Sequence, residues 1–344
     1  MSTTYKYEEM SQRVGFRKDI SDETFLTALN RRLEPFEEQA TDENAAAFPR
    51  VLILGLHRSG TTVLSQLLAH YLGLGVVDNI AARFWLAPAT GIRLSRMLLG
   101  NDRVTTLSST YGKTAGLGEP HEFSYFWHHW FKMENMPPYD PAAAARTVDW
   151  TAFTSTMRSM TRAWGKPMVL KAPDVAYHIE DVATTLPEDI FINITRDPAD
   201  IVVSLLRARM AYYGNTETWL GSYPERWDVL QGMNGRDQVA GQVLLLADMA
   251  RKGLRRLPAR RVVHLTLQHL CADPASAIAD VRDRLNACPG VSVDIQATPP
   301  EKLTYNTYES TPEYAVCAQR LAVMREKLLS MGLLDSDGGE GQCA

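Results

Sequence analysis

Short apolar runs alternate with longer amphipathic segments along most of this 344-residue chain. Continuous apolar runs are typical of strands buried on both faces of a parallel sheet, and apolar positions three and four apart are typical of helices. Strands are predicted over 51–54, 168–170, 190–194 and 262–265. Helices are predicted over 61–72, 175–186, 198–213, 238–257, 274–285 and 313–331. The alternation predicts an α/β fold, a three-layer α/β/α arrangement around a central parallel sheet.

The order of the strands and helices also predicts where a ligand binds. Right-handed crossovers place all strand-to-helix loops along one edge of a parallel sheet, and ligands bind at that edge. We therefore expect the loops after Leu54, Leu170 and Ile194 to line one cleft, although they are far apart in the sequence.

The chain contains no internal repeat, and we interpret residues 1–334 as a single domain followed by a flexible tail at 335–344. A segment near 115–165 is interpreted as an insertion between strands. Within it, residues 119–138 contain six aromatic residues and three histidines. The segment is either a helix packed on the core or a wall of an acceptor pocket.

Composition excludes several classes of protein. The chain is 45% hydrophobic and 22% charged with a net charge of −4, so no broad basic surface for nucleic acid is expected. No apolar run is long enough for a membrane span, and the N-terminus has no signal-peptide pattern. The four cysteines have no metal-ligand spacing, and no metal site is expected. These features favour a cytoplasmic protein, and they fix no oligomeric state.

A glycine-containing loop between the first strand and its helix is the strongest functional motif. In such a loop, backbone N–H groups and the positive end of the helix dipole face a bound anion, and glycines let the backbone approach it closely. The loop runs Gly55, Leu56, His57, Arg58, Ser59, Gly60, Thr61, Thr62.

The spacing of this loop is similar to that of a nucleotide-binding P-loop, with one informative difference. Thr61 occupies the position where ATP- and GTP-using enzymes carry a lysine for the β- and γ-phosphates. A cation is available earlier in the loop, at Arg58. The loop therefore suits an anion other than a magnesium-bound triphosphate.

A second motif follows the strand at 190–194. Asp197 is a good helix N-cap and Pro198 a good first helical residue. Ser204 lies about two turns into that helix, so its hydroxyl and the guanidinium of Arg196 are expected to converge on one phosphate.

Together these motifs resemble those of the sulfotransferase superfamily, over residues 50–290. The stretch 57–64 resembles that family's loop for the 5′-phosphosulfate, and 195–204 resembles its motif for the 3′-phosphate. The resemblance implies that 3′-phosphoadenosine 5′-phosphosulfate (PAPS) is the co-substrate, without a metal, and that its sulfuryl group passes to a hydroxyl of a small acceptor. It also implies that the donor is bound by His57, Arg58, Ser59, Gly60, Thr61, Thr62, Arg196 and Ser204.

The sequence pattern indicates the catalytic residues less clearly than the donor-binding residues. Lys171 follows a strand and is a candidate to contact the bridging oxygen or the transferred group. Three residues of one cluster, Glu119, His121 and Glu122, are candidates for the base. His121 is slightly preferred because its ordinary pKa suits a general base, whereas a glutamate needs its pKa raised by an apolar pocket. All three stay open.

Two other functions fit parts of the pattern. A P-loop kinase needs a lysine at position 61 and an acid at a strand end for magnesium. A nucleotide-binding module without catalysis needs the phosphate ligands but no base. The aromatic segment favours a partly apolar acceptor, such as a lipid, a polyketide or an aromatic natural product.

Overall fold

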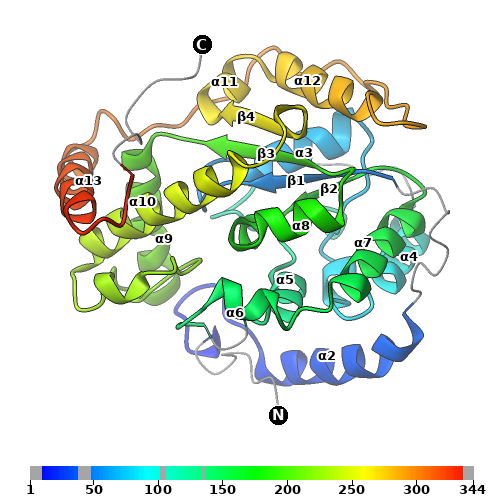
Figure 1. Ribbon diagram of the computed structural model, residues 1–344, viewed down its shortest axis with the longest axis horizontal. Coiled ribbons are helices and arrows are strands. Elements are labelled where there is room, and N and C mark those ends of the chain that lie inside the picture. The colour runs from blue at the N-terminus through cyan, green and yellow to red at the C-terminus, as the bar shows by residue number, and fades with distance from the viewer. Residues whose placement is uncertain (1–9, 38–47, 101–105, 134–135, 336–344) are drawn as a thin grey trace.

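The computed structural model describes residues 10–37, 48–100, 106–133 and 136–335. Within these ranges, the strands form one parallel sheet in the order β2-β1-β3-β4 (Figure 1). The strands are β1 Arg50–Leu54, β2 Met168–Lys171, β3 Ile190–Thr195 and β4 Val262–Thr266. Each predicted strand is confirmed to within one residue at either end.

The register of the sheet brings the ends of the strands to a common edge. Ile53 of β1 pairs with Lys171 at the end of β2, and Leu54 pairs with Asn193 of β3. The sheet is buried, and β1 has no exposed residue. The loops after β1, β2 and β3 therefore meet at one edge.

Helices cover both faces of this sheet, which confirms the three-layer α/β/α prediction. In Figure 1, α3 (Thr61–Tyr71) lies behind the strands and contacts β1 and β2, whereas α8 (Ile179–Thr185) and α10 (Gly235–Leu254) lie in front. The C-terminal helices are α9 Pro198–Tyr213, α11 Leu267–Ala272, α12 Pro274–Asn286 and α13 Pro312–Ser330. Buried side chains of α9, α10 and α13 form a second apolar cluster beside that of the sheet.

Capping residues explain where α9 begins, whereas α8 begins without a side-chain cap. The carboxylate of Asp197 accepts a hydrogen bond from the backbone N–H of Asp200, and Pro198 opens α9 as predicted. The predicted helix over 175–186 is wrong in its extent, because a 3-10 helix at Pro173–Tyr177 precedes α8. His178 leaves helical geometry, with φ of −135°, and its Nε2 lies 2.6 Å from the hydroxyl of Tyr139.

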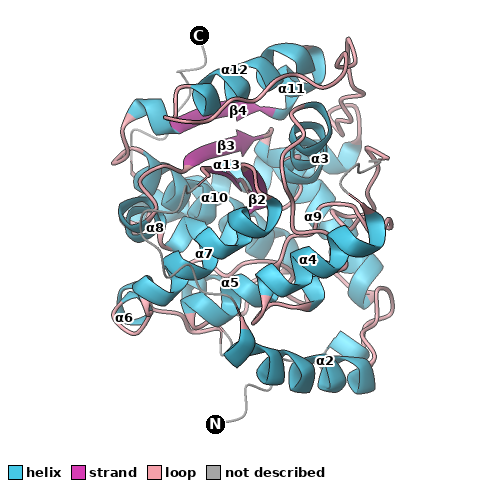
Figure 2. Cartoon of the chain, turned by 90° about the vertical axis from the view of Figure 1, so that its right-hand side faces the viewer, coloured by secondary structure: helices cyan, strands magenta, loops and turns pink. Residues whose placement is uncertain are grey.

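The aromatic segment packs inside the protein. Phe126, Trp127 and Phe131 of α5 (Ser124–Phe131) are fully buried, as is most of Phe123 before it. They lie against the sheet and the inserted helix α7 (Trp150–Trp164). The other helices of this half are α2 Ile20–Leu33, α4 Pro88–Leu99 and α6 Pro141–Ala145. Figure 2 shows α2 at the far end of the molecule from α12.

Of the segment predicted to be a flexible tail, only Asp335 lies within the described residues, and 336–344 lie outside them. In the part of the chain that the structure describes, no helix is both long and apolar enough to cross a bilayer.

Candidate active site

The loop after β1 adopts a conformation that needs its two glycines. Gly55 has φ of 145° and Gly60 has φ of 103°. A Cβ atom at Gly55 would lie 2.6 Å from the carbonyl oxygen of Ile194, and one at Gly60 would lie 2.5 Å from Leu267 Cδ1. Any side chain at either position would push the loop away from β3 and α11.

The loop ends at the N-terminus of α3, where Gly60 is the N-cap residue and supplies no side-chain acceptor. The first N–H groups of a helix have no partner within the helix, and the helix dipole is positive at this end. Thr61 and Thr62 provide hydroxyls at the same place. This end of α3 is thus built to bind an anion.

Arg58 joins the two predicted phosphate motifs. Its Nε donates a hydrogen bond to Ser204 Oγ at 2.9 Å, and its guanidinium lies 5.5 Å from the ring centroid of Tyr111. Burial lowers the pKa of Arg58, and the neighbouring charge of Arg196 acts in the same direction. An anion bound between Arg58 and Arg196 would therefore stabilise these two neighbouring cations.

Arg196 lies beside Arg58 with hydrogen-bonding capacity to spare. One terminal nitrogen donates to the carbonyl of Arg58 at 3.0 Å and the other to that of Asn306 at 2.6 Å. It also faces the buried carboxylate of Asp200 at 3.5 Å. Its Nε is buried and, among the described residues, has no hydrogen-bond partner. Arg196 and Ser204 therefore converge on Arg58, as neighbours of one potential phosphate site.

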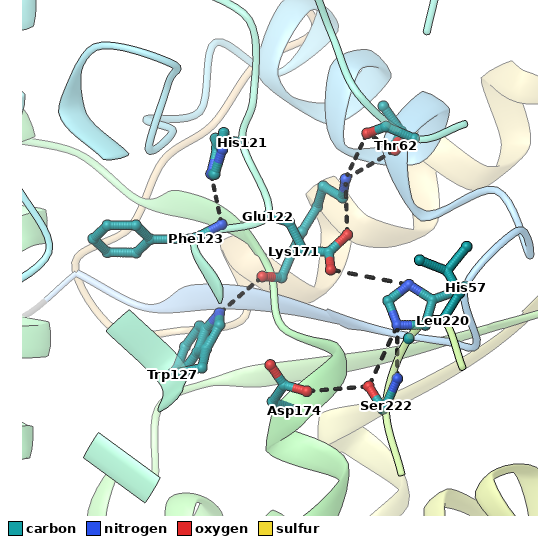
Figure 3. A network of polar contacts seen from close by, with 12 residues as sticks. His57, Thr62, His121, Glu122, Phe123, Trp127, Lys171, Asp174, Leu220 and Ser222 are labelled. Atoms are coloured by element: carbon teal, nitrogen blue, oxygen red, sulfur yellow. Dashed lines mark hydrogen bonds and ion pairs between the residues drawn. The ribbon is translucent and has the colours of Figure 1, made fainter. Parts of the chain in front are cut away.

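Lys171 reaches the same place from the end of β2. Its ammonium donates to Thr62 Oγ1 at 2.9 Å and to the carbonyl of Gly112 at 3.3 Å, and it lies 3.4 Å from Glu122 Oε2 (Figure 3). The residue is 2% exposed. Burial lowers the pKa of Lys171, and the carboxylate of Glu122 opposes that effect.

Glu122 places a partly exposed carboxylate beside Lys171. Its side chain is 27% exposed, and Oε1 lies 4.0 Å from Nδ1 of His57. Burial would raise the pKa of Glu122, but the charges of Lys171, His57 and His121 lower it to about 2. Glu122 is therefore ionised at neutral pH.

The other two candidate bases have different surroundings. His121 Nδ1 accepts a hydrogen bond from the backbone N–H of Phe123 at 2.8 Å. His121 is nevertheless exposed at the surface. Partial desolvation, followed by the charge of Lys171, lowers its pKa, and because Nδ1 accepts from Phe123 the neutral ring carries its proton on Nε2. Glu119 is 1% exposed and accepts hydrogen bonds from Gln66 at 2.8 Å and from the backbone of Thr106 at 2.6 Å.

The family model described as the sulfotransferase family matches residues 49–287, well over half of the chain. The chain belongs to the sulfotransferase family. Its fold is similar to that of sulfotransferase STF1 from Mycobacterium tuberculosis H37Rv, with a TM-score of 0.50 and 14% identity over 92% of this chain and 89% of that one. Sulfotransferase STF9 from Mycobacterium avium has a TM-score of 0.46 and 15% identity, over 94% and 84% of the respective chains. No curated protein matches this sequence.

This sulfotransferase also contains site residues that sequence reasoning missed. Nε2 of His57 lies 3.3 Å from both the backbone nitrogen and the hydroxyl of Ser222, and that hydroxyl donates to Asp174 at 3.2 Å. The carbonyl oxygen of Gly112 accepts hydrogen bonds from both Lys171 Nζ and Thr62 Oγ1. Of these residues, only Asp174 could have been found from the sequence, because it lies just after the end of a strand. Ser222 and Gly112 lie in loops that contain no motif.

A pocket of about 260 Å³ opens beside the loop of the sulfotransferase, on the α10 side of the sheet. None of the described residues of the aromatic segment, 119–133 and 136–138, lines it. The side chains and backbone that line it include Leu56, His57, Tyr177, Asn193, Ile201, Ser222, Leu246 and Arg325.

Asp197, the acid that a magnesium-dependent kinase would need, is engaged elsewhere. It caps α9 and accepts a hydrogen bond from the Tyr314 hydroxyl at 3.1 Å. Within the ranges that the structure describes, no group of three His, Cys, Asp or Glu side chains is arranged to hold a metal ion.

Proposed function

We propose that this protein transfers a sulfuryl group from PAPS to a hydroxyl of a small, partly apolar acceptor. The observation that carries the proposal is the convergence of three cations from three strand ends. Arg58, Lys171 and Arg196 meet at the uncapped N-terminus of α3, with a carboxylate, Glu122, on one side.

The residues fit the two anionic ends of this donor. The 5′-phosphosulfate suits the end of α3, where Thr61, Thr62 and the backbone of the loop lie within reach of Lys171 and Arg58. The 3′-phosphate suits Arg196 and Ser204, because Nε of Arg196 is buried without a partner among the described residues. Ser59 Oγ is likewise buried without one, and it lies beneath the loop next to Gly55.

The proposed step is a direct displacement at sulfur. The acceptor oxygen forms a bond to sulfur while the bond from sulfur to the bridging phosphate oxygen breaks, and the electron pair stays on the phosphate. Arg58 and the dipole of α3 stabilise the charge that grows there. Lys171 stabilises the charge on the transferred group, and the acceptor proton passes to a base.

Glu122 is the best supported base among the three candidates. It is ionised and partly exposed, and its Oε2 lies 3.4 Å from the ammonium of Lys171. His121 uses its unprotonated nitrogen for Phe123, and Glu119 is enclosed by its own hydrogen bonds. The pKa of Glu122 is lowered, which is the opposite of the raised value expected for a glutamate base, so Glu122 is a weak base. Its proposed role is to take the proton late, once the bond to sulfur has made the acceptor oxygen strongly acidic.

The acceptor is proposed to lie on the His57 side of the loop, with its apolar part in the pocket beside α10. That pocket is mainly apolar in its lining, which also includes His57, Ser222 and several charged side chains such as Asp248 and Arg325. A small number of polar groups in a mainly apolar pocket orient a bound small molecule.

Calorimetric titration with adenosine 3′,5′-bisphosphate tests the donor assignment, with ATP and magnesium as the control ligand. Tight binding of the bisphosphate with weak binding of ATP supports the proposal. Equal affinity, or a preference for ATP, would overturn it in favour of a kinase. Release of the bisphosphate from PAPS in the presence of a panel of phenols and alcohols separates an enzyme from a module that only binds.

A further inference from the structure

The imidazole of His57 belongs to the loop in sequence but faces away from the end of α3. Its Nε2 accepts a hydrogen bond from the backbone N–H of Ser222 at 3.3 Å. A ring nitrogen that accepts from a backbone N–H carries no proton, so the neutral ring carries its proton on Nδ1. That nitrogen points to Oε1 of Glu122, 4.0 Å away (Figure 3).

The segment 220–222 packs directly against the ring of His57. Gly221 has φ of 88°, and a Cβ atom there would lie 2.6 Å from Cδ2 and 3.0 Å from Nε2 of His57. Gln242, which is 1% exposed on α10, donates to the carbonyls of Leu220 at 2.9 Å and Ser222 at 2.8 Å. The segment is thus anchored to a helix and pressed against the ring.

A buried acid completes the chain of contacts. The Ser222 hydroxyl donates to Asp174 Oδ1 at 3.2 Å, and the side chain of Asp174 is only 7% exposed. With its proton directed to Asp174, the Ser222 hydroxyl does not also donate to Nε2 of His57, 3.3 Å away, so the backbone N–H of Ser222 is the donor to that nitrogen. Asp174, Ser222, His57 and Glu122 therefore form a continuous line from the protein interior to the cleft.

We propose that His57 is a positioning residue for Glu122 rather than a donor ligand, with its Nδ1–H presented to the carboxylate and its tautomer fixed by the backbone N–H of Ser222. The proposal rests on the role given to Glu122 above. Lys171 holds Oε2 and His57 faces Oε1, so the carboxylate is restrained at both oxygens. The gap of 4.0 Å is of the kind that tightens when an active site fills with substrate.

Other charged and titratable groups also act on Glu122, and the test must separate them from His57. They are Lys171 of β2, His121 just before α5, Lys113 in the preceding loop and Tyr212 of α9.

The first test is the tautomer of His57 in the full chain, labelled with ¹⁵N-histidine and measured by long-range ¹H–¹⁵N NMR at pH 7.5. We expect a protonated Nδ1 and an unprotonated Nε2, assigned by loss of the signal in His57→Ala. Gly221→Ala should disturb this tautomer by forcing the segment away from the ring. A ring protonated on Nε2 in the wild-type protein overturns the proposal.

The second test compares two substitutions of His57. The amide nitrogen of His57→Asn can replace the Nδ1–H donor, whereas His57→Ala removes it. We expect the Glu122 titration, followed by ¹³C-carboxyl NMR from about pH 1.5 to 5, to move up by roughly one pH unit in His57→Ala and to be largely restored in His57→Asn. Affinity for adenosine 3′,5′-bisphosphate should change less than about twofold in both.

The outcomes distinguish this inference from the proposed function. A loss of about tenfold in bisphosphate affinity in His57→Ala, with the Glu122 titration unmoved, makes His57 a donor ligand and overturns the inference. If the wild-type protein does not bind the bisphosphate, the proposed function fails, while the tautomer and the Glu122 titration still decide the role of His57.

Discussion

Arg58 and Ser204 stand 146 positions apart in the chain and are joined by a hydrogen bond of 2.9 Å. Arg58 belongs to the loop after β1 and Ser204 to α9 after β3. Because β1 and β3 are paired in parallel, the loop and the helix start at the same edge of the sheet. The contact brings the two predicted phosphate motifs side by side at that edge.

Substitution of Arg196 by alanine should weaken the binding of adenosine 3′,5′-bisphosphate by about 2 kcal/mol, or roughly 30-fold, because a charge-assisted hydrogen bond to phosphate is lost. Calorimetry measures the change. Arg207→Ala is the matched control, since Arg207 lies on the same helix but forms an exposed ion pair with Glu313. Equal losses in the two variants would contradict the assignment of the 3′-phosphate to Arg196.

The three candidate bases should respond differently to substitution. Glu122→Gln should lower kcat by about 10²-fold or more with little change in bisphosphate affinity, which is the usual contribution of a general base. His121→Ala should lower kcat less than about tenfold, since the ring is neutral and bonded to Phe123. Glu119→Gln should mainly lower Tm, because it disturbs the bonds to Gln66 and Thr106. The measurement is release of the bisphosphate from PAPS with a phenol acceptor, and a larger loss in His121→Ala than in Glu122→Gln would transfer the role to His121.

Loss of Lys171 should destabilise the fold as well as stop turnover. Lys171→Met leaves Glu122 beside an apolar group and should cost about 3 kcal/mol in the free energy of unfolding. The double variant with Glu122→Gln should recover part of that loss, because no unpaired charge is left. Urea unfolding of the four proteins of this cycle gives the coupling energy. Strictly additive losses would mean that the two side chains do not form a pair.

Stability should also depend on pH through Glu122. Its pKa is lowered to about 2 in the folded protein, below the ordinary value of 4.5, so the unfolded state binds the proton more readily. The stabilisation is complete above pH 4.5 and is lost as the pH falls toward 2, with a size of about 3 kcal/mol. Glu122→Gln should flatten this part of the curve of unfolding free energy between pH 5 and 3. A curve parallel to that of the wild type would show that Glu122 does not have a lowered pKa.

The glycine at the start of the loop offers a matched pair of substitutions. Gly55→Ala adds both an unfavourable φ and a clash with the carbonyl oxygen of Ile194, whereas Gly165→Ala adds the unfavourable φ of 71° in open space. We expect Gly165→Ala to cost about 1 kcal/mol and Gly55→Ala at least about 2 kcal/mol more. Thermal unfolding compares them, and similar Tm values would mean that the loop has room to move at Gly55.

The sequence alone was sufficient for the layers and the order of the elements. The run 51–54 is apolar throughout and 190–194 is apolar apart from Asn193, and a sheet covered on both faces buries such strands. The start of α9 was equally clear, because Asp197 and Pro198 act through local hydrogen bonding and geometry. The break at His178 was not predicted, because it depends on a contact with Tyr139 that is distant in the sequence.

The glycine loop after β1 was likewise visible in the sequence, because glycines, a cation and a helix N-terminus act together within eight neighbouring residues. Tertiary structure alone decided which of the candidate bases lies beside Lys171. Glu119, His121 and Glu122 are near neighbours in the chain, yet one is enclosed, one is bonded to the backbone of Phe123 and one meets Lys171. His57 and Ser222 are 165 positions apart, and no local pattern links them. Their pairing arises only when α10 holds the 220–222 segment against the end of the sheet, because side-chain direction and burial depend on packing between elements rather than on spacing along the chain.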